Sequence, residues 1–358
     1  MNRNAMIAMS GGVDSSVAAY LMKERGFDCV GVTMKLFSNE DVGIDRGDTC
    51  CSLKDADDAR GVAYRLGIPH YVFNFSEDFI EQVIRRFVEA YEQGLTPNPC
   101  IDCNRYIKFE RLFLRAKELE YSFVVTGHYA RIEKDGAKGR YCLMKALDDT
   151  KDQSYFLYSM TQDQLTHTLF PLGELRKTEV REIALAQGFL NARKRESQDV
   201  CFVSGAGKNY ADFIEHYRGR PSKEGDFVDT KGGVLGRHKG LIRYTIGQRK
   251  GLGVALPRPL FVCGKDPVAN TVTLGEDRFL YSKVLFAHSL NWIDVPPSSA
   301  LRVRGKTRYR QPEQWATVER VEEDKMRVEF DEPQCAVAAG QAVVLYDENR
   351  VVGGGTIL

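Results

Sequence analysis

The sequence predicts an α/β protein with a parallel-sheet domain at its N-terminal end and two small β-rich domains after it, the last a β-barrel. Three observations support this fold class. Short apolar runs alternate with helical patterns, and a loop rich in serine and glycine joins the first apolar run to the first helix. From about residue 219, short apolar runs separated by glycines replace the helical patterns. The expected domain boundaries are therefore 1–205, 206–280 and 281–358.

The first domain has the strand and helix order of a doubly covered sheet. Strands are expected at residues 5–9, 29–34, 70–74 and 123–126, and helices at 17–22, 55–66, 78–91, 109–119 and 177–187. Alternating strands and helices indicate a parallel sheet with both faces covered. Such sheets bind ligands beyond the carboxyl ends of their strands, which is where the first loop, Met34 and Gly127-His128 fall.

Composition narrows the function classes. Hydrophobic residues make up 43% and charged residues 28% of 358 residues, as in globular proteins. No apolar run approaches the roughly 20 residues of a membrane helix, and the N-terminus has no signal-peptide pattern, so a cytoplasmic protein without a membrane partner is expected. The net charge of +1 excludes a general polyanion-coating role and leaves only local basic patches for nucleic-acid contacts.

The run Ser10-Gly11-Gly12-Val13-Asp14-Ser15-Ser16 carries the strongest chemical signal. Paired glycines permit a tight turn, and the amides at the start of the next helix then attract an anion. The serines add hydroxyl donors, and Asp14 could hold a magnesium ion beside phosphates. The run lacks the lysine and glycine spacing of a Walker loop and is not a dinucleotide fingerprint. The alternative is an ordinary glycine turn before a helix.

Nine unevenly spaced cysteines favour metal or catalytic thiols over a secreted disulfide framework. Cys103 follows two prolines near an expected helix start, where the helix dipole would lower the pKa of the thiol. The Cys100-x-x-Cys103 spacing allows zinc, but no second ligand pair follows at zinc-site spacing. Cys201 stands alone after a polar stretch, and adjacent Cys50 and Cys51 are left without a role.

The C-terminal domain combines a barrel pattern with an alternating row of cations. Five strands are expected at 301–309, 316–321, 326–330, 342–346 and 351–357, which suits a small barrel. Along 301–310, every second residue is basic, so one strand face would carry Arg302, Arg304, Lys306, Arg308 and Arg310. A nucleic-acid backbone would offset their repulsion, while a solvated edge strand protected by charge is the alternative.

The glycine loop resembles the pyrophosphate loop of the N-type ATP pyrophosphatases, which have an adenine nucleotide alpha hydrolase-like fold. The whole chain resembles the bacterial tRNA-specific 2-thiouridylase family, because further motifs of that family occur in the family's order. They are 96–99 with Cys103-Asn104, 127–129, 151–155, the Cys201 segment, 247–252 and 308–311.

The resemblance implies ATP-dependent thiolation of the wobble uridine, position 34, of tRNA. ATP with Mg²⁺ would adenylate the O2 atom and release pyrophosphate, after which a persulfide on Cys201 would attack C2. Cys103 would close a disulfide with Cys201 as sulfur is released, as redox chemistry of paired thiols allows. The target base would have to be flipped out of its stack. The implied partners are the tRNA anticodon stem-loop and a sulfur donor, either a persulfide relay protein or a cysteine desulfurase.

The same resemblance implies a role for individual residues. The catalytic domain would be 1–205, with 206–280 a central β-rich domain and 281–358 a tRNA-binding barrel. Catalysis is assigned to Cys103 and Cys201, with no resident metal site. ATP binding is assigned to Ala8, Met9, Ser10, Gly11, Gly12, Val13, Asp14, Ser15, Met34 and Gly127. Contact with the target base is assigned to Asn98, Pro99 and Cys100. Binding of the tRNA is assigned to His128, Lys151, Asp152, Gln153, Arg308, Tyr309, Arg310 and Gln341.

One departure from the family pattern opens an alternative chemistry. Many members have an aspartate where this chain has Cys100, so a carboxylate beside the target base is missing, and Asp102 is not its positional equivalent. Cys100, Cys103 and Cys201 could instead ligate an iron–sulfur cluster, which is an alternative route to the same thiolation.

Two other functions remain open at this stage. Another adenylating ATP pyrophosphatase would not require two cysteines, and a non-catalytic RNA-binding or sulfur-carrier protein would not require the intact loop. The sequence does not specify which tRNAs are accepted, which protein donates sulfur, or the oligomeric state.

Overall fold

The computed structural model describes residues 3–38, 53–137, 139–194, 200–203, 209–254 and 258–358. The chain divides into two compact units. Unit 1 comprises Met1–Val83, Pro99–Gly207 and Asn349–Val352, and unit 2 comprises Ile84–Asn98, Lys208–Glu348 and Gly353–Leu358. Cys50 and Cys51 lie outside the described residues. No helix of the described part is long and apolar enough to cross a membrane.

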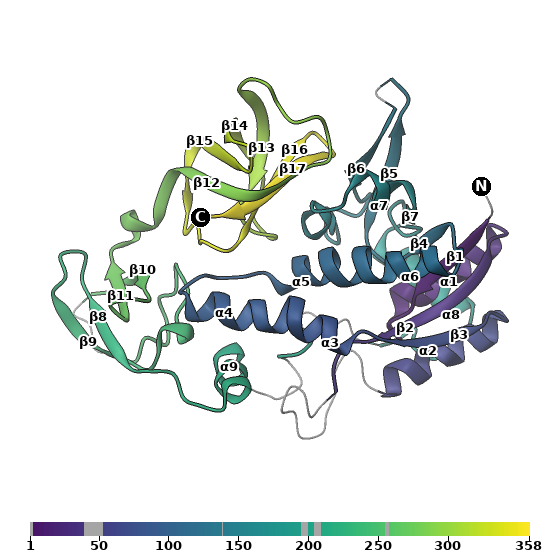
Figure 1. The fold of residues 1–358 in the computed structure, drawn as a ribbon, viewed down its shortest axis with the longest axis horizontal. Helices are drawn as coiled ribbons and strands as arrows, with labels where there is room; N and C mark the ends of the chain where they lie inside the picture. The colour runs from purple at the N-terminus through teal and green to yellow at the C-terminus, as the bar shows by residue number, and fades with distance from the viewer. Residues whose placement is uncertain (1–2, 39–52, 138, 195–199, 204–208, 255–257) are drawn as a thin grey trace. The chain divides into compact units, whose positions relative to one another are not determined.

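A five-stranded parallel sheet organises unit 1 (Figure 1). Its order is β3 (His70–Asn74), β2 (Asp28–Lys35), β1 (Asn4–Ala8), β4 (Phe123–Val125) and β7 (Thr168–Leu169). The four longer strands confirm the predicted sheet. Strand β7 was not among the predicted strands, because two residues are too few to show a periodic pattern.

The central strand β1 is buried on both faces. Ala5 and Ile7 belong to one apolar cluster, and Met6 and Ala8 to the other, because successive strand residues point to opposite faces. The first cluster includes residues of α1 (Val13–Glu24), α2 (Leu53–Leu66) and α8 (Lys177–Ala186), and the second includes residues of α6 (Leu112–Glu118).

The edge strand β3 departs from the expectation of a fully covered sheet. Tyr71 is 56% exposed and Val72 is 46% exposed. Within the described residues, β3 is the edge strand of this sheet and pairs with β2.

A helix expected at 109–119 begins ten residues earlier, at Pro99. It consists of α5 (Pro99–Asp102), a π-helical stretch (Cys103–Arg111) and α6. Proline suits the first helical position because no intrahelical partner needs its missing N–H. The helix expected at 78–91 is likewise composite, and consists of α3 (Ser76–Phe79), a π-helical stretch (Ile80–Arg85) and α4 (Arg86–Glu92).

Smaller elements complete unit 1. A hairpin of β5 (Ala130–Asp135) and β6 (Arg140–Lys145) follows β4, and α7 (Gln162–Thr166) precedes β7. The carboxamide of Gln162 joins α7 to β6 because it bonds both the N–H and the carbonyl of Tyr141.

Unit 2 contains a small mixed sheet and a closed barrel (Figure 1). The sheet has the order β10 (Phe261–Asp266), β11 (Thr271–Gly275), β8 (Gly225–Val228) and β9 (Val234–His238), and α9 (Tyr210–Arg218) precedes it. The barrel runs β12 (Tyr281–Trp292), β15 (Lys325–Cys335), β14 (Gln314–Glu322), β13 (Leu301–Lys306), β16 (Ala342–Asp347) and β17 (Arg350–Ile357), and pairing of β12 with β17 closes it. The predicted barrel is confirmed, but with six strands, since β12 was not among the five expected.

The core of unit 1 supports a stability prediction. Ile7 is fully buried at the centre of the sheet, so Ile7→Ala should lower the free energy of unfolding by about 2–5 kcal/mol. Leu190→Ala, at a side chain that is 93% exposed, is the matched control and should change it by less than about 0.5 kcal/mol. Chemical denaturation followed by circular dichroism measures both, and equal effects would contradict the assignment of this core.

Candidate active site

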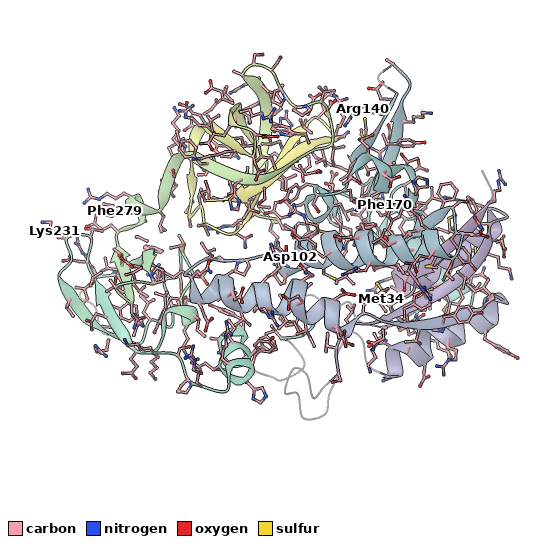
Figure 2. All side chains as sticks on the ribbon, in the orientation of Figure 1. Met34, Asp102, Arg140, Phe170, Lys231 and Phe279 are labelled. Carbon is pink, nitrogen blue, oxygen red and sulfur yellow. The ribbon has the colours of Figure 1, made fainter. Side chains whose placement is uncertain are left out.

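The loop after β1, Met34 near the end of β2 (labelled in Figure 2) and Gly127 after β4 follow strands of the same parallel sheet. The three strands are adjacent and parallel, so their carboxyl ends meet at one edge of that sheet. Gly12 precedes α1 and makes no side-chain cap, so no capping side chain occupies the amides of the first turn. This edge therefore has the geometry of an anion site.

Gly11 is required by close backbone packing. It has a φ of +70°, and a Cβ there would overlap the carbonyl of Asp55 and lie 2.9 Å from the Asp55 Cα. Gly127 is similarly confined, because its Cβ would lie 2.8 Å from the Ser15 nitrogen. Both glycines thus allow other backbone segments to reach the loop.

Two of the serine hydroxyls expected to contact phosphate are used inside the protein instead. Ser15 and Ser16 are buried, and each donates to the carbonyl of Gly12 at 3.0 Å. Ser10 is exposed, and its N–H donates to Ser15 Oγ at 3.2 Å. The expectation that Ser15 and Ser16 offer their hydroxyl protons to a ligand is therefore wrong for this conformation, and Ser10 is the accessible hydroxyl.

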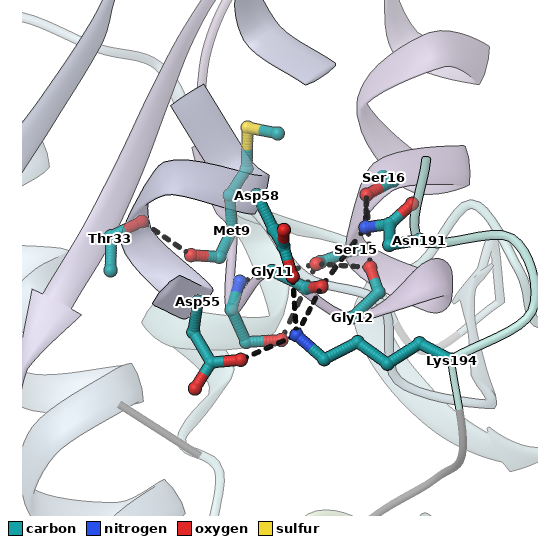
Figure 3. A network of polar contacts seen from close by, with 11 residues as sticks. Met9, Gly11, Gly12, Ser15, Ser16, Thr33, Asp55, Asp58, Asn191 and Lys194 are labelled. Atoms are coloured by element: carbon teal, nitrogen blue, oxygen red, sulfur yellow. Dashed lines mark hydrogen bonds and ion pairs between the residues drawn. The ribbon is translucent and has the colours of Figure 1, made fainter. Parts of the chain in front are cut away.

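Residues far along the chain hold the loop in place (Figure 3). Asn191 donates to the Gly11 carbonyl at 3.0 Å and to Ser16 Oγ at 2.9 Å. Lys194 donates to the same carbonyl at 3.2 Å and pairs with Asp55 at 2.5 Å and Asp58 at 2.7 Å. The loop is consequently fixed to both α2 and the turn after α8.

Asp14 does not present an open carboxylate. Lys177 Nζ lies 2.6 and 2.8 Å from its two oxygens, and the Tyr129 hydroxyl donates to it at 2.8 Å. Lys177 and Tyr129 are buried. A magnesium ion would have to displace this lysine, so the expected magnesium ligand does not fit the conformation observed.

His128 directly follows Gly127 and is only 9% exposed. Its Nδ1 lies 2.6 Å from Thr126 Oγ1, and its Nε2 lies 3.4 Å from Lys108 Nζ. Burial lowers the pKa of His128 well below its ordinary value, and the Lys108 cation lowers it further. The imidazole is therefore neutral near pH 7.

Cys103 occupies an environment that differs from the expected one. It is the first residue of the π-helical stretch, but Pro99 begins the helix, so Cys103 lies beyond the first turn. Burial raises the pKa of the Cys103 thiol; Lys108 lowers it in part, and Asp102 raises it. The predicted lowering of this pKa by the helix dipole is wrong, because desolvation disfavours the thiolate.

The other two candidate thiols have different surroundings. Cys100 is exposed in α5, whereas Cys201 is half-buried in a turn next to Phe202. The centroids of the Phe202 and Phe79 rings are 5.9 Å apart. Neither thiol is in a disulfide bond. Among the described residues, no three His, Cys, Asp or Glu side chains form a group that could hold a metal, so these thiols are not arranged as cluster ligands.

The segment from Lys151 to Gln153 mainly organises the backbone around Tyr129. Asp152 is buried and accepts from the N–H groups of Ala146 and Ser154, and Gln153 Oε1 accepts from the Tyr129 N–H at 2.9 Å. This segment therefore positions Tyr129, the partner of Asp14.

In unit 2, the row of cations is only partly as predicted. Strand β13 ends at Lys306, so Arg308 and Arg310 are not on it, although both are exposed. Arg308 donates to the carbonyl of Ala336. Arg302 pairs with Asp331 on β15, so the charge of Arg302 is already neutralised within the barrel. The acid comes from another strand of the barrel, which the sequence near Arg302 does not reveal.

The residues that hold the loop were not predicted as site residues from the sequence: Tyr129, Lys177, Asn191, Lys194, Asp55 and Asp58. Lys177 is 163 positions from its partner Asp14, and no local pattern links the two. The only available signal was that Lys177 is the first residue of a well-predicted helix.

Models of known protein families match almost the whole chain. A family model described as tRNA methyl transferase HUP domain matches residues 3–205. A tRNA methyl transferase PRC-barrel domain matches residues 211–276, and an aminomethyltransferase beta-barrel domain matches residues 282–357. With the loop at the edge of the parallel sheet, these matches define a nucleotide-binding HUP-domain protein with two appended β domains.

Curated relatives identify the family. A tRNA-specific 2-thiouridylase of Clostridioides difficile is 49% identical over 100% of this chain and 98% of its own length. One from Moorella thermoacetica is 51% identical over 98% of each chain. The chain belongs to the tRNA-specific 2-thiouridylase family. A solved 4-thiouridine synthetase–RNA complex with ATP aligns with 60% of this chain and 50% of its own at 18% identity, with a TM-score of 0.35.

The Asp14–Lys177 pair predicts a measurable coupling. Lys177→Met leaves a carboxylate that is only 30% exposed without its cation, so the free energy of unfolding should fall by about 1–3 kcal/mol. Adding Asp14→Asn should recover part of that loss. The control is Lys117→Met at the exposed Lys117–Asp163 pair, expected to cost less than about 1 kcal/mol. Denaturant titrations of the wild type, Lys177→Met, Asp14→Asn, the double variant and the Lys117→Met control test this, and additive effects of the two single variants would disprove the coupling.

Proposed function

We propose that this protein is a tRNA-uridine 2-sulfurtransferase that uses ATP to thiolate C2 of the wobble uridine, position 34, of tRNA. The observation that carries the proposal is the identity of 49% and 51% with relatives named tRNA-specific 2-thiouridylase, over essentially the whole chain. The glycine loop at the sheet edge gives that similarity a chemical basis, since it suits a polyphosphate.

ATP would bind at the sheet edge that carries the loop. The amides at the start of α1 would face phosphate oxygens, Ser10 would donate its hydroxyl proton, and Met34 and Gly127 would line the nucleotide. The remaining proposed ATP contacts are Ala8, Met9, Gly11, Gly12, Val13, Asp14 and Ser15. Mg²⁺ would enter with ATP, and we assign it no protein ligand because Asp14 is paired with Lys177.

Sulfur transfer would proceed in balanced steps. The uridine O2 attacks the α-phosphorus of ATP, and pyrophosphate leaves. The terminal sulfur of a Cys201 persulfide attacks C2, and AMP leaves. The Cys103 thiolate then attacks Cys201 Sγ, which breaks the sulfur–sulfur bond, forms a Cys103–Cys201 disulfide and leaves sulfur on C2. A donor protein with a persulfide and an external dithiol would restore the starting state.

The environment of Cys103 sets a condition on its proposed resolving role, because the thiol must lose its proton before it can attack Cys201 Sγ. Burial raises the pKa of its thiol, so the resting group is protonated and a poor nucleophile. Lys108 would stabilise the thiolate once a base removes its proton, since it lowers the same pKa. The iron–sulfur alternative has no such support, because the described thiols do not form a ligand group.

The remaining assignments extend this proposal. Asn98, Pro99 and Cys100 would contact the target base, and tRNA would bind His128, Lys151, Asp152, Gln153, Arg308, Tyr309, Arg310 and Gln341. The catalytic domain would be 1–205, the central domain 206–280 and the tRNA-binding barrel 281–358. We further propose that the enzyme acts in the cytoplasm, where a persulfide relay protein or a cysteine desulfurase supplies sulfur to it.

Nucleoside mass spectrometry tests the activity. Purified protein, ATP, Mg²⁺, a persulfide source and unmodified tRNA should yield 2-thiouridine at position 34, together with pyrophosphate. Cys103→Ser and Cys201→Ser should each lose thiolation but still release pyrophosphate with tRNA present, because adenylation precedes sulfur transfer. Cys142→Ser, at another half-buried thiol, should retain both activities.

The same preparation separates the two sulfur routes. Anaerobically purified protein should thiolate without iron, and Cys100→Ser should remain active. Activity that requires iron and disappears in Cys100→Ser would instead establish the cluster route. Absence of 2-thiouridine and of tRNA-dependent pyrophosphate release would disprove the proposed function itself.

Salt dependence tests the barrel cations. If Arg310 contacts a tRNA phosphate, Arg310→Ala should weaken binding and reduce the slope of log affinity against log salt by somewhat under about 1. Arg302→Ala is the control, because Asp331 already neutralises Arg302, and it should leave the slope unchanged. Filter binding at several salt concentrations measures the affinity and slope of both variants. An unchanged slope for Arg310→Ala would show that Arg310 contacts no tRNA phosphate.

A further inference from the structure

Residues 95–98 form the segment that leads into Pro99, and its backbone is held by other parts of unit 2. The Thr96 N–H donates to the Ala339 carbonyl at 2.8 Å. The Gln341 carboxamide donates to the Thr96 carbonyl at 2.8 Å and lies 3.5 Å from the Pro97 carbonyl. Lys265 Nζ lies 3.4 Å from the Leu95 carbonyl. Three consecutive carbonyls of this segment therefore have side-chain donors from distant positions.

The turn that carries Gln341 is itself fixed. The Gly340 N–H donates to the Ile357 carbonyl at 2.8 Å, and the Ile357 N–H donates to the Gln341 carbonyl at 2.8 Å. Gly340 has a φ of +87°, and a Cβ there would lie 3.0 Å from Leu95 Cβ and 3.1 Å from the Thr96 nitrogen. The turn thus lies close against the segment, and both this tight approach and the positive φ favour glycine at position 340.

Lys265 provides a second attachment from the small sheet. It lies on β10, its amine is 5.9 Å from the centroid of the Tyr91 ring, and it reaches the segment from another element than Gln341. Burial lowers the pKa of Lys265 to about 8, and the amine remains a donor in either protonation state.

We propose that Gln341 and Lys265 are positioning residues that hold residues 95–98 so that Asn98 is ready for the target base. This inference rests on the proposed function for its reference to the base. It differs from a role for Gln341 as an RNA contact alone: RNA that takes the Gln341 amide would compete with the Thr96 and Pro97 carbonyls. Binding of RNA at the turn and the position of the base-contact segment are then coupled.

Hydrogen exchange on the RNA-free full-length protein tests the attachment directly. In Gln341→Ala, amides of a peptide covering 95–98 should exchange about two- to tenfold faster, the range expected for one lost hydrogen bond. Lys265→Met keeps the side-chain length and removes the hydrogen-bond donor, so amide exchange in the same peptide should again be faster than in the wild type. Gln93→Ala, at an exposed glutamine just before the segment, is the matched control and should match the wild type.

The outcomes separate the alternatives. If Gln341 serves only as an RNA contact, Gln341→Ala leaves exchange at 95–98 unchanged without RNA, and the proposal is overturned. A peptide from β15 reports general destabilisation. If amide exchange in the β15 peptide is also faster in Gln341→Ala, the Lys265→Met variant is used instead. Faster exchange in that variant at 95–98 alone would support the proposal, and unchanged exchange at 95–98 would overturn it.

Kinetics give a second readout that a merely structural role would not produce. With wild-type thiolation established first, Gln341→Ala should lower kcat at saturating tRNA by about two- to tenfold with a smaller change in KM, because the base is misplaced after binding. Lys265→Met should likewise lower kcat with a smaller change in KM. A rise in KM alone would indicate loss of an RNA contact. An inactive wild type would refute the proposed function, while the exchange result would still stand.

Discussion

The close packing of Gly11 against the Asp55 backbone is the contact on which the nucleotide site depends. Because no side chain separates them, α2 can supply Asp55 and Asp58 to Lys194, and Lys194 can reach the Gly11 carbonyl. Asn191 adds a bond to the same carbonyl. The loop is thereby set before any ligand binds, which is what fixed donors for a phosphate require.

The charges around this loop are arranged in internal pairs. Lys177 neutralises Asp14, and Lys194 lies between two aspartates, so the protein offers backbone amides and the Ser10 hydroxyl to an anion and keeps its carboxylates occupied. Buried or half-buried charges without partners would be costly. This pairing also explains why Asp14 is a poor candidate for a metal ligand despite its place in the loop.

Unit 2 contributes more than a basic surface to the proposed enzyme. Its barrel cations are partly occupied, since Arg302 pairs with Asp331 and Arg308 bonds the Ala336 carbonyl. Its turn at Gln341 instead holds the backbone of residues 95–98. A residue assigned to RNA by resemblance can thus also organise the protein, and the two roles compete for the same amide protons.

Elements that depend on local pattern could be predicted from the sequence: the four longer parallel strands, the glycine loop before α1, and the small barrel. These follow from side-chain periodicity and from the backbone freedom of glycine, which are properties of neighbouring residues. The partners of the charged side chains and the pKa of Cys103, in contrast, depend on tertiary packing. Lys177 meets Asp14 across 163 positions, Asp331 reaches Arg302 from another strand, and burial raises the Cys103 pKa where a helix start alone predicted a decrease. Pairing over such distances and desolvation depend on what packs around a residue, and no local stretch of sequence contains that information.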